Sequence, residues 1–215
     1  MLSYSQFIQE DFKSPADLQS ALDWYRPMMK LCYQYGDTEI VWRGVHNKSG
    51  IILATNDRQG YMGAILPHVK NHINNLKELF DIRQPIFATR SLSAAKFFGT
   101  PMVMIPVPPF VCVWSTELRD SGDIDRDLRY KTVELSSGST YRQSIPGYTG
   151  PHPDNPIYKT YQKLENKFPP ADWKGELIFD CKQYYMYYPN QKKNHTTYRE
   201  VANELYGKIK RLEEK

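Results

Sequence analysis

Residues 175–188, GELIFDCKQYYMYY, contain two runs of strand-forming side chains that are interrupted near Lys182. β-Branched and aromatic side chains fit the pleated, half-buried surface of a sheet. The pattern therefore predicts strands at residues 176–181 and 183–188, with a bulge or turn between them. Glu176 stands at the start of the first strand, where a carboxylate precedes an apolar run.

Similar strand-forming runs occur in the first half of the chain. They cover residues 38–44 (TEIVWRG), 51–54 (IILA), 86–89 (IFAT), 102–107 and 110–114. Pro106, Pro108 and Pro109 predict a turn between the last two runs, because proline has no N–H group to donate to a sheet.

Helical periodicity marks four further segments. They cover residues 16–35, 69–80, 93–98 and a final segment that begins at Thr197. Ser14 and Asp17 have the spacing of a capping box at the start of the first helix, and Pro27 is expected to kink or split that helix. Thr197 and Glu200 have the same capping-box spacing. We expect Gly36 to end the first helix.

The order of these elements predicts an α+β fold with a mixed or antiparallel β core, N-terminal helices and a C-terminal helix. At 215 residues, with 40% hydrophobic and 24% charged side chains, the chain is expected to form one domain over residues 1–215. Its expected parts are a helical segment at 1–36, a long surface excursion at 116–171 with one helix around 158–166, and a C-terminal helix at 197–215.

Charge and cysteine content restrict the class of protein. The formal net charge of +4 is scattered, which is not typical of a nucleic-acid-binding surface. No apolar run approaches the roughly 20 residues that a membrane span needs, and the first residues lack a signal peptide, so we expect a cytoplasmic protein. Cys32, Cys112 and Cys181 lie far apart in apolar surroundings, which predicts buried thiols rather than disulfides.

Three strand segments carry the residues of chemical interest. They are residues 41–45 (VWRGV), residues 87–92 (FATRSL), and residues 175–179 (GELIF). In this order they resemble the Arg, Ser-Thr-Ser and Glu strands of the Arg-Ser-Glu class of ADP-ribosyltransferases. The resemblance spans roughly residues 38–188 and implies an ADP-ribosyltransferase-like fold that binds NAD as a substrate.

The resemblance implies a role for each of these residues. Glu176 would stabilise the oxocarbenium-like ribose that forms when the nicotinamide bond breaks. Arg43 would hold the pyrophosphate with its planar guanidinium group, and Gly44 would let NAD approach the backbone closely. Thr89 or Ser91 would brace Arg43 and Glu176, which are expected to face each other. Tyr61 or Phe98 would stack on nicotinamide.

Two positions depart from the pattern of the family. Arg90 lies inside the Ser-Thr-Ser region, and Lys174 stands where arginine-modifying members carry a second acidic residue. Structural interpretations also remain open for the key residues. Arg43 can be an ordinary arginine before a turn, Ser91 can cap the helix that follows it, and Glu176 can be solvated at a strand end.

Other candidate sites are weaker. His68 and His72 have the i, i+4 spacing of metal ligands, but the surrounding pattern of a metalloprotease is missing, and we predict no metal site. The basic residues at 208–211 alternate with an apolar face, which is typical of a solvated helix surface.

The sequence therefore leads to two functional hypotheses. The first is a mono-ADP-ribosyltransferase-like protein that transfers ADP-ribose from NAD to a host protein or nucleic acid, with no membrane partner. Its compact size resembles phage-encoded or toxin-type members, which implies action in a host cytoplasm or association with a virion. The alternative is a catalytically inactive phage structural or host-takeover binding protein on the same fold, with Tyr141, Tyr148, Tyr158 and Tyr161 as its contact surface.

Overall fold

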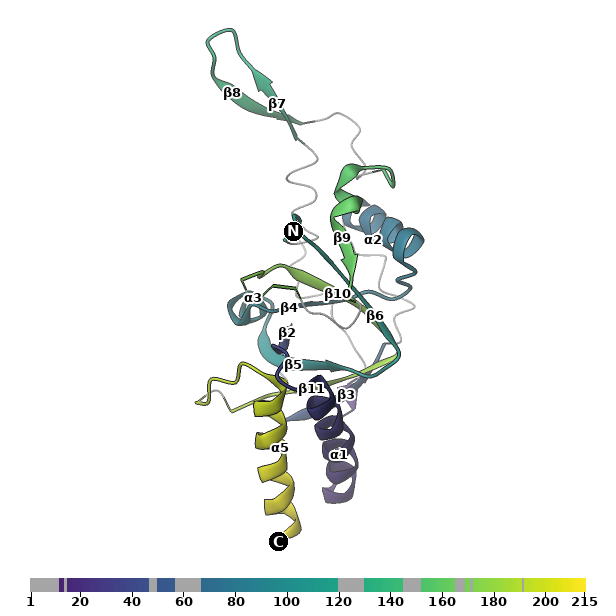
Figure 1. The fold of residues 1–215 in the computed structure, drawn as a ribbon, viewed down its shortest axis with the longest axis vertical. Helices are drawn as coiled ribbons and strands as arrows, with labels where there is room; N and C mark the ends of the chain where they lie inside the picture. The colour runs from purple at the N-terminus through teal and green to yellow at the C-terminus, as the bar shows by residue number, and fades with distance from the viewer. Residues whose placement is uncertain are drawn as a thin grey trace.

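The structure is a computed structural model that describes residues 12–13, 15–46, 50–56, 67–119, 130–144, 152–164, 169–170, 172–190 and 192–215. Figure 1 shows helices packed around a strongly curved central sheet. The strands are β1 (Phe12–Lys13), β2 (Val41–Val45), β3 (Ile51–Thr55), β4 (Ile86–Thr89), β5 (Thr100–Pro106), β6 (Phe110–Ser115), β7 (Tyr130–Glu134), β8 (Thr140–Ser144), β9 (Tyr161–Lys163), β10 (Glu176–Cys181) and β11 (Gln183–Tyr187). The helices are α1 (Leu18–Tyr35), α2 (Pro67–Phe80), α3 (Leu92–Phe97), the short 3₁₀ helix η3 (Pro156–Thr160) and α5 (Tyr198–Glu213).

Nine strands form the central sheet in the order β1-β3-β11-β5-β2-β4-β10-β6-β9. Each pairing between neighbours that the structure describes is antiparallel. The expected α+β class with an antiparallel core, an N-terminal helix and a C-terminal helix is therefore confirmed.

The two faces of this sheet are buried in different ways. On the inner face, side chains from seven strands form one cluster that contains no helical residue, so the sheet curls until this face packs on itself. On the outer face, α1, α5 and Ala95 of α3 cover the half that contains β3, β11, β5 and β2. Helix α2 and η3 cover the other half, over β10 and β6. The outer cover is thus divided between two groups of helices.

Strands β10 and β11 are consecutive in sequence but lie in different halves of the sheet. β10 pairs with β4 and β6, whereas β11 pairs with β3 and β5. The break expected near Lys182 is real, and it marks the place where the chain crosses from one half to the other rather than a tight hairpin.

The helix boundaries follow local capping chemistry, with one correction. Asp17, not Ser14, is the N-cap of α1, and its carboxylate accepts a hydrogen bond from the Ser20 N–H at 2.7 Å. Pro27 is exposed and lies within a continuous α1, so it does not split the helix. The capping box of Thr197 and Glu200 is confirmed at the start of α5.

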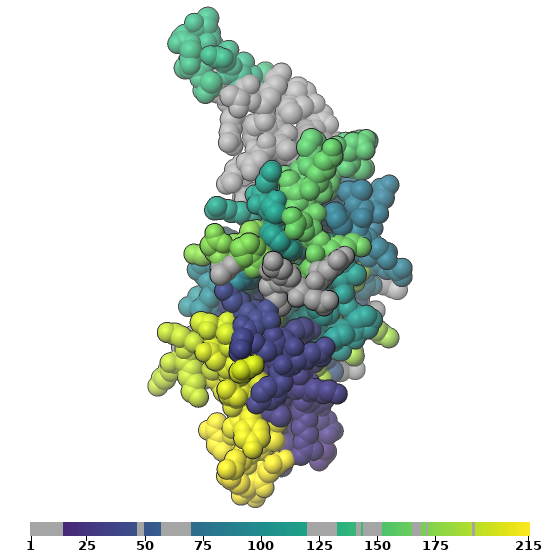
Figure 2. Space-filling model, in the orientation of Figure 1, coloured from purple at the N-terminus to yellow at the C-terminus, as the bar shows by residue number. Residues whose placement is uncertain are grey.

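The segment expected as a surface excursion contains more strand than predicted. β7 and β8 form a hairpin that stands away from the rest of the described chain (Figures 1 and 2). The helix expected around 158–166 is wrong, because η3 ends at Thr160 and Tyr161 begins β9, which pairs with β6. Tyr158 and Tyr161 are buried and so do not form the expected contact surface. Tyr148 lies outside the described residues.

Two further expectations concern thiols and the membrane. Cys32, Cys112 and Cys181 are free and buried, as predicted. Burial raises the pKa of the Cys32 thiol to about 12, so this thiol stays protonated and unreactive at neutral pH. Among the helices that the structure describes, none combines the length and apolar character needed to cross a bilayer.

Candidate functional site

The three segments that carry the family resemblance lie on neighbouring strands. β4 is placed between β2 and β10 at the centre of the sheet. In the register of these strands, Trp42 is opposite Thr89, and Thr89 is opposite Glu176. Because directly opposed residues of antiparallel strands point to the same face, these three side chains form a row on the outer face.

Arg43 does not belong to this row. It lies between Val41 and Val45, whose side chains belong to the inner cluster, and its own side chain is only 3% exposed. Its Nη1 donates a hydrogen bond to the Phe87 carbonyl at 2.5 Å, and its guanidinium carbon lies 6.0 Å from the ring centre of Tyr184. The expectation that Arg43 and Glu176 face each other is therefore not met, because strand alternation sends them to opposite faces.

Gly44 is required by packing against a helix. A Cβ atom at this position would lie 2.2 Å from the Ala95 carbonyl oxygen and 2.8 Å from the Phe98 Cβ. Helix α3 thus occupies the space that was expected for NAD, and Phe98 lies at the C-terminal end of that helix. Tyr61, the other expected stacking residue, lies outside the described residues.

Thr89 and Ser91 organise the turn from β4 into α3. The Thr89 hydroxyl accepts from the Ser91 N–H at 3.0 Å and donates to the Gly175 carbonyl at 3.3 Å, directly before Glu176. Ser91 accepts from the Ala94 N–H at 3.2 Å, so its role as a helix cap is confirmed. Thr89 therefore links the end of β4 to the backbone at the start of β10, directly before Glu176. A residue that positions Glu176 would make such a contact.

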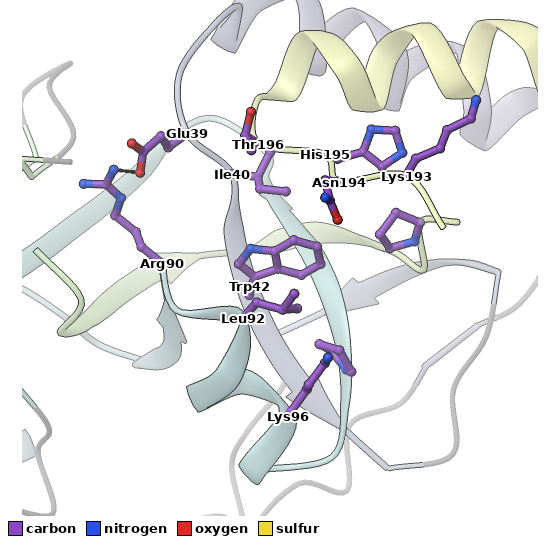
Figure 3. Close-up of a pocket in the computed structure, with 12 residues that line it drawn as sticks. Glu39, Ile40, Trp42, Arg90, Leu92, Lys96, Lys193, Asn194, His195 and Thr196 are labelled. Atoms are coloured by element: carbon purple, nitrogen blue, oxygen red, sulfur yellow. Dashed lines mark ion pairs between the residues drawn. The ribbon is translucent and has the colours of Figure 1, made fainter. Parts of the chain in front are cut away.

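A groove opens on the outer face between α3 and the segment that leads into α5. It consists of two cavities of about 520 and 440 Å³ that share Glu39, Arg90, Leu92 and Lys96. Figure 3 shows the Trp42 ring at the centre of the larger cavity, with Leu92 and Lys96 on one side and Asn194 and His195 on the other. The smaller cavity reaches Trp173 and Lys174, and therefore ends two residues before Glu176.

The wall of the larger cavity is held by a buried carboxylate. Glu204 of α5 accepts hydrogen bonds from the Tyr187 hydroxyl and from the Asn190 N–H, and its Oε2 lies 2.5 Å from Nε2 of His195. Burial tends to raise the pKa of Glu204, but the hydrogen bonds from Tyr187 and His195 bring it below its ordinary value. Glu204 is thus ionised at neutral pH, and it fixes the segment that contains His195.

Both ring nitrogens of His72 lie within hydrogen-bond distance of tyrosine hydroxyl groups. Its Nδ1 lies 3.1 Å from the Tyr158 hydroxyl and its Nε2 lies 3.0 Å from the Tyr161 hydroxyl. Burial lowers the pKa of His72 to about 3, so the ring is neutral. Both ring nitrogens therefore have partners under α2, and within the part of the chain that the structure describes there is no group of three potential metal ligands.

Several groove residues were not expected from the sequence. Trp42, Glu39 and Lys96 line the groove, and none of them was among the predicted site residues. Strand alternation places Trp42 and Arg43 on opposite faces of the sheet. All five residues of β2 are buried, however, so its sequence lacks the polar–apolar alternation that would show which residue faces the groove.

Comparison with known proteins finds no family model that matches the chain, and neither a curated protein nor a solved structure matches it significantly.

Proposed function

We propose that the chain is an ADP-ribosyltransferase-like protein that binds NAD in the groove and transfers ADP-ribose to a protein or nucleic-acid acceptor. The observation that supports this most is the direct pairing of Glu176 with Thr89 on the outer face, in the two strands that carry the Glu and Ser-Thr-Ser segments of the resemblance. Neither residue of the pair lines the groove, whose smaller cavity reaches Lys174, two residues before Glu176 in the sequence.

The proposed reaction breaks the bond between nicotinamide and the ribose carbon C1′. Nicotinamide leaves with the bonding electrons, C1′ develops positive charge, and a nucleophile of the acceptor forms the new bond and loses its proton. The carboxylate of Glu176 stabilises the developing charge and orients a ribose hydroxyl. Thr89 holds the backbone at Gly175 and thereby sets the position of Glu176.

Arg43 has a structural role in this proposal, because it is enclosed in the inner cluster. The groove cations Arg90 and Lys96 replace it as partners for the pyrophosphate. Lys174, two residues before Glu176, argues for an acceptor other than arginine. We propose a host component as the acceptor, with the protein phage-encoded and acting in the host cytoplasm.

Incubation with labelled NAD and a cell extract tests the proposal. Wild-type protein is expected to label an acceptor and to release nicotinamide, whereas Glu176→Gln should lose at least about 100-fold in rate, as removal of a group that stabilises a transition state does. NAD should raise the melting temperature of both proteins, because Glu176→Gln keeps the groove. Equal labelling by both proteins would reject Glu176 as the catalytic residue.

The opposite orientation of Arg43 and Glu176 favours a second candidate function. The chain would then be a catalytically inactive binding protein that has kept the fold without the Arg–Glu pair. This candidate predicts no release of nicotinamide by the wild type. Thermal stabilisation by NAD without turnover would identify an inactive NAD-binding protein, and neither effect would identify a protein with another partner.

A further inference from the structure

Arg90 lies at the junction of the two cavities that form the groove. It follows β4 directly and lines both cavities, although its side chain is only 4% exposed. A guanidinium group that is buried this deeply and still borders an open groove is positioned to recognise an anion with little loss of side-chain freedom.

The hydrogen bonds of Arg90 divide its guanidinium group into two parts. Nη1 donates to the carbonyl groups of Pro169 and Pro170, each at 2.5 Å, and these bonds fix the group in place. Nη2 forms an ion pair with Glu39 (Figure 3). Nε has no acceptor among the residues that the structure describes. The edge formed by Nε and Nη2 is paired with Glu39, and the charge of Asp172 also acts on Arg90, although this edge can bind two oxygens of one anion.

Glu39 can leave this edge without unfolding its surroundings. Its side chain is 43% exposed, so rotation into water requires no movement of buried groups. Its backbone remains held by the isolated bridge to Thr197, at the start of α5. The buried guanidinium needs an anionic partner, and an incoming anion can take the place of the partly exposed carboxylate without leaving that charge unpaired.

The rest of the groove favours a phosphate as that anion. Its described lining contains one acidic residue, Glu39, and the cations Arg90, Lys96, Lys174 and Lys193. Trp42 lines the larger cavity and Trp173 lines the smaller one, and Arg90 borders both. Aromatic rings stack on flat bases, so the arrangement fits a ligand with phosphates at its centre and planar groups at its ends.

We propose that the phosphate groups of the ligand displace Glu39 from Arg90, so that Glu39 acts as an internal competitor that sets the affinity of the groove. This inference rests on the proposed function insofar as it takes the pyrophosphate of NAD as the displacing group. It adds a phosphate-binding residue, Arg90, and a residue that limits binding, Glu39.

Calorimetric titration with NAD tests this exchange. Glu39→Gln is expected to raise the affinity about fivefold, because the amide is neutral and releases Arg90 more readily. Arg90→Lys keeps the charge but loses the planar fork, and should weaken binding at least about tenfold. Glu213→Gln is the matched control, because it removes a carboxylate from an exposed pair with Arg26 outside the groove and should leave the affinity unchanged.

The variants also separate this inference from the proposed function. Unchanged or weaker NAD binding by folded Glu39→Gln would overturn the exchange, even if the wild type transfers ADP-ribose. If NAD does not bind, inorganic pyrophosphate is the second probe: tighter binding by Glu39→Gln than by the wild type supports the exchange without NAD chemistry, and no binding overturns it. Arg90 also anchors Pro169 and Pro170, so circular dichroism must show that Arg90→Lys folds. If it does not, Glu39→Gln decides alone.

Discussion

Arg43 and Arg90 lie on and directly after neighbouring strands, and both donate hydrogen bonds to backbone carbonyl groups, yet their surroundings differ. Arg43 is enclosed by the inner cluster, near Tyr184. Arg90 borders the groove and pairs with a carboxylate that is half in water. A buried guanidinium group is therefore not by itself a ligand-binding group, because access depends on the face of the sheet to which it points.

The largest effect is expected when the enclosed arginine, Arg43, is replaced. Arg43→Met keeps an unbranched side chain, shorter by two atoms, but leaves the Phe87 carbonyl without its donor, and should lower the free energy of unfolding by about 3 kcal/mol. Urea denaturation measures this change. If Arg43→Met kept its stability and lost NAD binding, Arg43 would belong to the binding site, and the contrast with Arg90 would be lost.

Substitution of Gly44 tests how closely α3 packs against β2. Gly44→Ala should cost about 2 kcal/mol or more, because the new methyl group would meet the Ala95 carbonyl at 2.2 Å. The control is Gly207→Ala in the middle of α5, where a Cβ would meet nothing within 4 Å. That variant should gain about 1 kcal/mol through helix propensity. A stable Gly44→Ala protein would mean that α3 does not fill this space.

Substitution of Glu204 tests whether this carboxylate stabilises the wall of the groove, and its effect on the free energy of unfolding should depend on pH. Its side chain is 5% exposed, and Glu204→Gln should cost about 1.5 kcal/mol at pH 7 by replacing charged hydrogen bonds with neutral ones. Because folding lowers the pKa of Glu204, its contribution is complete above the unfolded pKa of about 4.5 and is lost as the pH falls through the lower folded value. The stability difference between wild type and variant should therefore shrink below about pH 4 in urea titrations. A difference that is constant from pH 7 to pH 3 would contradict this role.

The smallest expected effect concerns Glu39. Glu39→Gln removes an ion pair whose acidic partner is 43% exposed but whose cation is buried, and the neutral amide can still accept a hydrogen bond, so the free energy of unfolding should fall by about 1 kcal/mol. Thermal denaturation at two salt concentrations measures it. A loss of several kcal/mol would show that Glu39 is needed to neutralise Arg90, and Glu39 could not then leave that residue when a ligand binds.

Local sequence patterns predicted most of the secondary structure but not the orientation of the site. Residues 86–89 were expected as a strand and form β4, and Thr197 caps its helix as its spacing with Glu200 indicated. Strand β2 is buried on both faces, so its sequence lacks the alternation of apolar and polar residues that would have shown which way Arg43 points. This is why Arg43 was expected in the site and Trp42 was not.

Long-range pairings explain the other differences. The contact between Arg90 and Glu39 joins residues that are far apart in the chain, and no local signal links them. Tyr158 and Tyr161 were expected on the surface because the segment around them is polar, but their hydroxyl groups find a partner in His72 beneath α2. A buried tyrosine of this kind is recognisable only once its hydrogen-bond partner is placed.

The crossing at Lys182 has a consequence for the order in which the protein folds. Without β10 and β11, the described strands of the sheet separate into three groups, β1-β3, β5-β2-β4 and β6-β9. β11 joins the first group to the second, and β10 joins the second to the third. A nascent chain that has reached only residue 175 therefore holds three unconnected pieces of sheet, and their assembly waits for the synthesis of twelve further residues, Glu176 to Tyr187.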